Sequence, residues 1–333
     1  MASAGVSIPL ISSSSLNTQD NILDKFASIP GVRTSLSLEE FQAQLQKVGS
    51  VIASIPKQVI SSYQKVFKFD YASASGMSLA EIENLVLSQK LAGGIQGIVF
   101  DVKVGEGSFL KNRHEAIIFI SALERVCNLL EIPSSFLLSD LDQPLGESIG
   151  NRLEVIEAVK VLRGNGPLDV LKLALELGAE MLFLAKKSKT KIIAKSNLKR
   201  KIEDGNAIKK FEEIINAQGG NPLFISADSL LFQSKLVKRV HSPRKGYLHK
   251  VKMKEINHLW SKLMTNEPER DKAGFLIFKK IGDRIDENEA IAEVYLSEES
   301  PWPGIKRQLR EAFILLKNAP DFKPFIIESI RKN

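Results

Sequence analysis

Short apolar runs alternate with helical segments through the middle of this 333-residue chain, and this alternation restricts the fold more than any other feature. Residues 97–102 (GIVFDV) and 135–141 (SFLLSDL) are apolar runs of strand length, and helical patterns follow at 114–130 and 152–162. Strands that alternate with helices in this way form a largely parallel sheet with crossover helices. The sequence therefore predicts an α/β fold with a mixed, mostly parallel sheet and flanking helices.

Capping residues and apolar spacing predict where further helices begin and end. Ser37 is a typical N-cap, and apolar residues keep helical spacing from there through 51–52. A helix that begins at Pro167 is expected to stop at Gly178, because glycine favours helix C-termini and proline favours the first helical position. A further helical stretch is expected at 78–91.

The pattern changes near residue 225, where short strand-like runs replace the regular alternation. We therefore expect an α/β core over 1–225 and a smaller C-terminal α+β domain over 226–333. The expected strands of the second domain are 246–252, 273–279 and 290–296, and its last helix is expected at 306–317.

Composition excludes several classes of protein. The single Cys127 excludes an intrachain disulfide and favours a reducing, cytoplasmic location. No apolar run approaches the roughly 18 residues of a membrane span. The net charge of +7 is concentrated in the basic run 186–201. No aromatic residue interleaves with this run to stack on bases, so we expect a solvated surface and no nucleic-acid partner.

Three long motifs resemble the thymidine or pyrimidine-nucleoside phosphorylase family. They are QKLAGGIQGIVFDVKVG at 89–105, LDQPLGESIGNRLEVIEA at 141–158, and AQGGNP at 217–222. The resemblance implies a nucleoside phosphorylase/phosphoribosyltransferase-like core with a remnant helical hairpin at 62–92. It also implies the activity, in which phosphate attacks the anomeric carbon of a pyrimidine nucleoside and the base departs. Phosphate is then a co-substrate, and no further cofactor is required.

The residues that the resemblance implies for base recognition are replaced. The family's arginine, serine and lysine fall on Asp70, Leu85 and Gln89. A threonine that would contact phosphate falls on Ile22, which leaves Ser12 as the one matching phosphate contact. The family's phosphate loop has no counterpart before Ser12, so we expect the chain to be truncated at its N-terminus relative to the family.

Other family positions are retained. Phe109 and Leu110 match apolar walls of the base pocket, although both also suit an ordinary core. The resemblance also implies a potassium ion held by the backbone carbonyls of Leu145 and Ser148 and by the carboxylate of Glu157. The alternative for Glu157 is a salt-bridge partner on a helix.

These observations leave three hypotheses. The first is a degraded phosphorylase homologue, a pseudoenzyme with little or no activity as this chain alone. The second is one half of a split phosphorylase, completed by a partner polypeptide that carries the N-terminal part. The third is a non-catalytic scaffold that binds nucleosides or other proteins. Homodimerisation stays open in all three.

Overall fold

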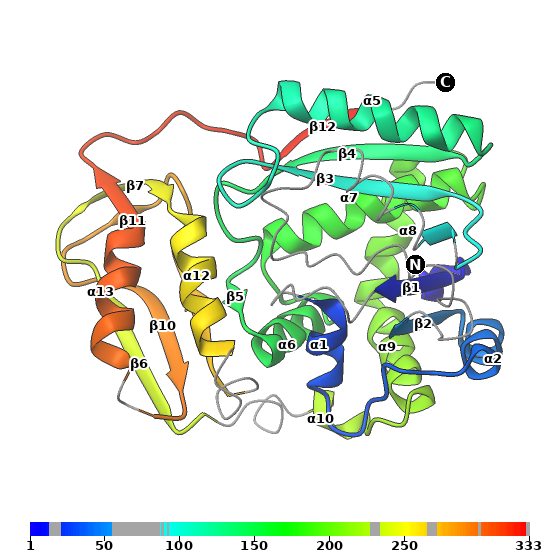
Figure 1. Cartoon of the computed structure of the whole chain (residues 1–333), viewed down its shortest axis with the longest axis horizontal. Coiled ribbons are helices and arrows are strands. Elements are labelled where there is room, and N and C mark those ends of the chain that lie inside the picture. The colour runs from blue at the N-terminus through cyan, green and yellow to red at the C-terminus, as the bar shows by residue number, and fades with distance from the viewer. Residues whose placement is uncertain are drawn as a thin grey trace, which may run out of the picture.

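The structure is a computed structural model that describes residues 1–12, 21–54, 87, 90–91, 93–226, 234–264, 272–298 and 301–330. Two groups of elements lie side by side in it (Figure 1). The first contains the parallel strands and most of the helices, and the second contains β6 to β11 with α12 and α13.

The first group confirms the predicted α/β class. Strands β3 (Ile98–Val104) and β4 (Ser134–Asp140) are parallel and paired along their whole length. The last strand of the chain, β12 (Ile326–Ile330), is added to β4 in the antiparallel direction, so this sheet is mixed. A second parallel pair joins β1 (Ile8–Ser12) to β2 (Ser50–Ser54).

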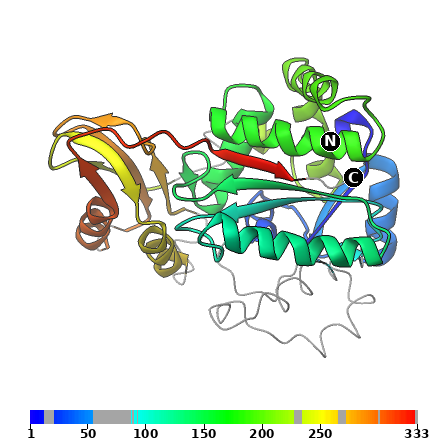
Figure 2. The ribbon, with the colours of Figure 1, turned by 90° about the horizontal axis from the view of Figure 1, so that it is seen from above.

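Helices cover both faces of the β3–β4 sheet. Figure 2 shows α5 (Arg113–Leu129) and α7 (Leu168–Leu184) on opposite sides, and both contact the two strands. The sequence explains this arrangement because one apolar face of α5, including Phe119, Leu123 and Cys127, is buried against the sheet. The remaining helices of this group are α1 (Ile22–Ala27), α2 (Leu38–Val48), α6 (Asn151–Leu162), α8 (Lys191–Glu203), α9 (Asn206–Ala217) and α10 (Leu223–Ser226).

The second group has its own apolar core, in which Leu248, Ile256, Phe275 and Val294 are buried. Its two antiparallel sheets have the strand orders β5-β8-β10-β6 and β11-β7-β9. Strand β5 (Ser148–Ile149) reaches this group from the α/β core. The other elements are β6 (Leu236–His241), β7 (Gly246–Val251), α12 (Met253–Met264), β8 (Gly274–Ile277), β9 (Arg284–Ile285), β10 (Ala290–Leu296), α13 (Trp302–Ala312) and β11 (Phe313–Leu316).

Three of the predicted helices have wrong boundaries. Helix α2 begins after Ser37 as predicted, but it ends at Val48, and residues 51–52 belong to β2. Helix α7 continues through Gly178 to Leu184, and a Cβ atom at 178 would lie 2.6 Å from the Leu198 Cδ1 atom of α8, so the helices are closely packed here. The helix predicted at 306–317 begins earlier, at Trp302, and ends at Ala312, and the apolar residues after it pair with β7 as a strand.

The division of the chain at 225/226 stays a prediction. Two strands do not follow this division. Strand β5 precedes residue 225 but pairs in the second group's sheet, and β12 follows residue 226 but pairs in the first group's sheet. Apart from Leu87, Lys90 and Leu91, the predicted hairpin at 62–92 lies outside the described residues.

Candidate functional site

A cleft of about 1700 Å³ lies between the two groups of elements, at the carboxyl end of β4. The α/β core contributes the ends of β4 and β12, the 141–148 segment and the turn between α6 and α7. The second group contributes His249, Tyr295 and the 280–282 segment. The crevice at the carboxyl ends of parallel strands is where α/β folds bind ligands, so this cleft is the candidate site.

One carboxylate, Asp140, ends β4, and a second, Asp142, lies two residues later. Asp142 Oδ1 accepts a hydrogen bond from the Glu106 backbone N–H at 2.9 Å, and Asp140 Oδ2 accepts one from the Asp142 N–H at 3.2 Å. The segment around Glu106 is therefore a turn whose backbone binds the Asp142 carboxylate. Burial, reinforced by the nearby charge of Asp142, raises the pKa of Asp140 to about 6. Lys323, from the segment before β12, lies 3.6 Å from Asp142.

The segment 143–148 is held to α6 by Glu157. One oxygen of this buried carboxylate, Oε2, accepts hydrogen bonds from the N–H groups of Glu147 at 2.7 Å and Ser148 at 3.1 Å. Burial raises the pKa of Glu157, and the two backbone N–H groups oppose that shift. Glu157 therefore has a clear structural role in fixing this segment.

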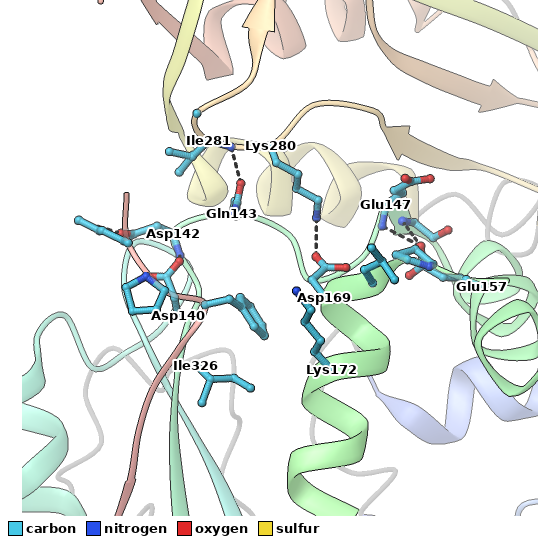
Figure 3. Close-up of a pocket in the computed structure, with 18 of the residues that line it drawn as sticks. Asp140, Asp142, Gln143, Glu147, Glu157, Asp169, Lys172, Lys280, Ile281 and Ile326 are labelled. Atoms are coloured by element: carbon cyan, nitrogen blue, oxygen red, sulfur yellow. Dashed lines mark hydrogen bonds and ion pairs between the residues drawn. The ribbon is translucent and has the colours of Figure 1, made fainter. Parts of the chain in front are cut away.

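Lys280 holds the same segment from the other side (Figure 3). Its ammonium donates to the backbone oxygen of Pro144 at 2.7 Å, to that of Gly146, and to Asp169 Oδ2 at 2.9 Å. Burial opposes the ionisation of Asp169, but the adjacent Lys280 holds the pKa of this carboxyl below its usual value. Next to it, the Ile281 N–H donates to Gln143 Oε1 at 2.6 Å.

Sequence reasoning did not identify Lys280 or Asp169 as site residues. They are 111 residues apart, and no local pattern connects a lysine after a strand with an aspartate in the first turn of a helix. Only the fold brings them together at the cleft.

The predicted base-pocket and phosphate residues lie elsewhere. Phe109 is half-exposed and contacts Phe119 edge-on, whereas Leu110 is buried in the core between α5 and its sheet. Ser12 ends β1, and its hydroxyl donates to Asn21 Oδ1 at 3.1 Å. None of these three predicted residues is among those that line the cleft. Asp70, Leu85 and Gln89 lie outside the described residues.

The potassium site predicted at Leu145, Ser148 and Glu157 stays a prediction. Ser148 and Glu157 lie together, and the Ser148 N–H donates to one carboxylate oxygen of Glu157, Oε2. A hard cation needs several oxygens that face it. Within the described ranges, no group of three or more His, Cys, Asp or Glu side chains could hold a metal ion.

The basic run 186–201 forms part of α8 and the segment before it. Lys191 pairs with Glu180, Lys195 pairs with Glu176, and Lys199 lies 3.6 Å from Glu203. Acidic neighbours on α7 and α8 thus offset three of its charges. Across the described parts of the chain, no helix is long and apolar enough to cross a membrane.

Comparison with known proteins identifies similar sequences along most of the chain. The chain is 30% identical over 305 residues to the pyrimidine-nucleoside phosphorylase of Bacillus subtilis (strain 168). The aligned region covers 90% of this chain and 70% of the relative. It is 29% identical over 316 residues to the pyrimidine-nucleoside phosphorylase of Geobacillus stearothermophilus, and this alignment covers 93% of this chain and 73% of the relative. No protein-family model matches the chain.

Proposed function

Because the chain belongs to the pyrimidine-nucleoside phosphorylase family, we propose that it retains the scaffold for a pyrimidine nucleoside but catalyses little or no phosphorolysis. In that reaction a phosphate oxygen forms a bond to the anomeric carbon while the glycosidic C–N bond breaks. The electron pair of that bond leaves with the base. A competent site therefore needs groups that bind phosphate and groups that stabilise negative charge on the departing base.

The observation that carries the proposal is the environment of Ile22. This residue is the first of α1, and its apolar side chain is 38% exposed where the family resemblance implies a phosphate-binding hydroxyl. The neighbouring polar groups are already engaged, because Asn21 Oδ1 accepts from the Leu23 N–H and from the Ser12 hydroxyl. The Ser12 proton is therefore directed at Asn21 and is not available to a phosphate oxygen in this arrangement.

The replaced base-recognition residues support the same proposal. The positions that the resemblance assigns to an arginine, a serine and a lysine are Asp70, Leu85 and Gln89. A carboxylate at the first position would oppose the negative charge that develops on the base, whereas the family's cation would stabilise it. Loss of one such donor typically lowers the rate about 100-fold or more.

The test is phosphate-dependent release of thymine from thymidine, and of uracil from uridine, by the purified chain at high enzyme concentration. We expect a rate about 10,000-fold or more below that of the Bacillus subtilis relative under the same conditions, because at least two donors are lost. A rate within tenfold of the relative would refute the proposal. Thermal denaturation with and without nucleoside separates binding from turnover, and stabilisation without base release is the expected result.

A further inference from the structure

We propose that the end of the α/β core opposite to the cleft is a docking surface for lipid membranes that carry anionic headgroups. This surface is formed by the turns that follow α5 and α7 and by the first turn of α8. We call it the sheet-end surface. It shares no residue with the lining of the cleft, and docking there requires no nucleoside turnover.

The two turns lie next to each other at the amino ends of β3 and β4. Helices α5 and α7 end there, on the side of the core away from the second group (Figure 1). A Cβ atom at Gly97, the residue before β3, would lie 3.1 Å from Leu184 Cδ2 and 3.4 Å from the Pro133 oxygen. Helix α8 begins at Lys191, which pairs with Glu180 of α7, so its first turn lies beside the end of α7.

Large aliphatic side chains of the sheet-end surface are exposed to solvent. Leu129 and Leu130 are 79% and 47% exposed at the end of α5, and Ile192 and Ile193 are 83% and 48% exposed in the first turn of α8. A helix end that served only to cover the core would bury such side chains. Exposed apolar groups gathered at one end of a molecule mark a contact surface.

Three lysines in the turn between α7 and α8 add positive charge beside these aliphatic side chains. Lys186, Lys187 and Lys189 are exposed, and none of them forms an ion pair with a described residue, in contrast to the lysines that follow on α8. A hollow of about 510 Å³ lies between the three lysines and the end of α7. Lysines beyond a helix C-terminus also complement the helix dipole, but that role does not account for the isoleucines beside them.

An anionic lipid surface satisfies both kinds of group. Lysines attract the negative headgroups, and aliphatic side chains enter the boundary between headgroups and acyl chains. Glu131, in the turn after α5, is an opposing charge that the three lysines outweigh. A nucleic acid would leave the aliphatic side chains without a partner, because bases stack on aromatic rings.

The experiment measures co-sedimentation of the full chain with two kinds of vesicle, one of phosphatidylcholine alone and one of equal parts phosphatidylglycerol and phosphatidylcholine. We expect binding to the anionic vesicles only, and weaker binding at higher salt because the headgroup charges are screened. Replacement of all three lysines by glutamine should weaken that binding by about 100-fold. The double variant Ile192→Ser and Ile193→Ser should weaken it by about tenfold or more.

The matched control removes the same charge from the second group, through Lys235→Gln, Lys245→Gln and Lys254→Gln. These lysines are also exposed, but they lie outside the sheet-end surface, so the affinity should change by less than about threefold. Ile192→Trp gives a local readout, because its emission should shift to shorter wavelength when anionic vesicles are added. Lys254→Trp, in the second group, should show no such shift.

Absence of binding to the anionic vesicles would overturn the proposal. So would equal losses in the two triple variants, because the net charge of the chain would then explain the binding. Binding to soluble heparin but not to vesicles would also overturn it, because the lysines would then form a general site for polyanions. All the replaced side chains are exposed, and if the lysine variant nevertheless fails to fold, the emission of Ile192→Trp with the two kinds of vesicle decides the question.

Discussion

The side-chain amide of Gln218 pairs with both backbone groups of Ile52, in the manner of a neighbouring strand. Gln218 Oε1 accepts from the Ile52 N–H at 3.1 Å, and Nε2 donates to the Ile52 oxygen at 2.9 Å. Gln44 Nε2 donates to the same Oε1, and the Arg33 oxygen accepts from the same Nε2. The fully buried amide therefore uses all four of its hydrogen-bonding positions and fixes β2 against the end of α9.

Gln218→Leu should lower the free energy of unfolding by about 3 kcal/mol, because the part-buried N–H of Ile52 and the buried amide of Gln44 lose this acceptor. Urea denaturation followed by circular dichroism measures the change. Gln42→Leu, on the exposed face of α2, is the control and should change the free energy by less than about 0.5 kcal/mol. Equal effects of the two substitutions would contradict the role assigned to Gln218.

Local signals in the sequence predicted the elements that depend on local chemistry. Ser37 forms the predicted N-cap, since its hydroxyl accepts from the Glu40 N–H and its own N–H donates to the Glu40 carboxylate. Strand β10 has the predicted bounds 290–296. The alternation of apolar strands with helices was sufficient to predict the α/β class, because sequential elements in such folds pack next to each other.

Features that depend on distant contacts could not be predicted in this way. Gly178 has the sequence signature of a helix end, but α7 continues through it because packing against α8 outweighs the weak local preference of one glycine. Strand β12 joins β4 across almost 200 residues of sequence, and no local pattern indicates that partner. The candidate site has the same limitation, since Lys280 and Asp169 meet only after both groups of elements have folded.

Gly146→Ala should destabilise the chain by about 3 kcal/mol. Gly146 has a φ of +70°, and a Cβ atom there would overlap Glu157 Oε1, so the carboxylate would have to leave its two N–H donors. Gly205→Ala is a matched control, because Gly205 has the same φ of +70°, but a Cβ atom there would meet nothing within 4 Å among the described residues. The control should cost only about 1 kcal/mol, which is the backbone contribution alone. Equal losses in urea denaturation would show that Glu157 does not restrict this position.

Lys191→Met should lower the free energy of unfolding by about 2 kcal/mol at neutral pH. Glu180 is buried, and Lys191, Ser135 and Ser329 all donate to it. Removal of the cation leaves a buried charge without its ion pair, although partial exposure of the lysine keeps the cost below that of a fully buried pair. Lys195 lies on the same helix as Lys191, and Lys195→Met removes its more exposed pair with Glu176. This control should lower the free energy of unfolding by less than about 1 kcal/mol.

The effect of Lys191→Met should also depend on pH. Burial alone would raise the pKa of Glu180, but its three donors hold that pKa below the ordinary value of 4.5. Because the pKa of Glu180 is lower in the folded chain, ionised Glu180 stabilises the folded state above pH 4.5. This stabilisation is lost as the pH falls through the folded-state pKa. The difference between the unmodified chain and Lys191→Met should therefore be largest near neutral pH and decrease below pH 4.5. A difference that stays constant from pH 7 to pH 3 would contradict the assignment of the pair.

At pH values above 6, Asp140→Asn should raise the melting temperature. The substitutions of Gln218, Gly146 and Lys191 are expected to destabilise the chain, so this effect has the opposite sign. Burial, together with the neighbouring charge of Asp142, raises the pKa of Asp140 from 3.8 to about 6. Its contribution to stability is therefore fully present below pH 3.8 and is lost as the pH rises towards 6. Asparagine keeps an oxygen that can accept from the Asp142 N–H but carries no charge, so we expect a gain of roughly 2–4 °C at pH 7–8.

The gain from Asp140→Asn should disappear as the pH falls from 6 to 4, because Asp140 then becomes protonated in the folded chain. Two other charged groups face it, Asp142 and the Lys323 that lies 3.6 Å from Asp142. Asp142→Asn removes the like charge, so in that background the gain from Asp140→Asn should be smaller at pH 7. A gain that does not change with pH, or that is the same in both backgrounds, would mean that the charge of Asp140 does not oppose folding at this edge of the cleft.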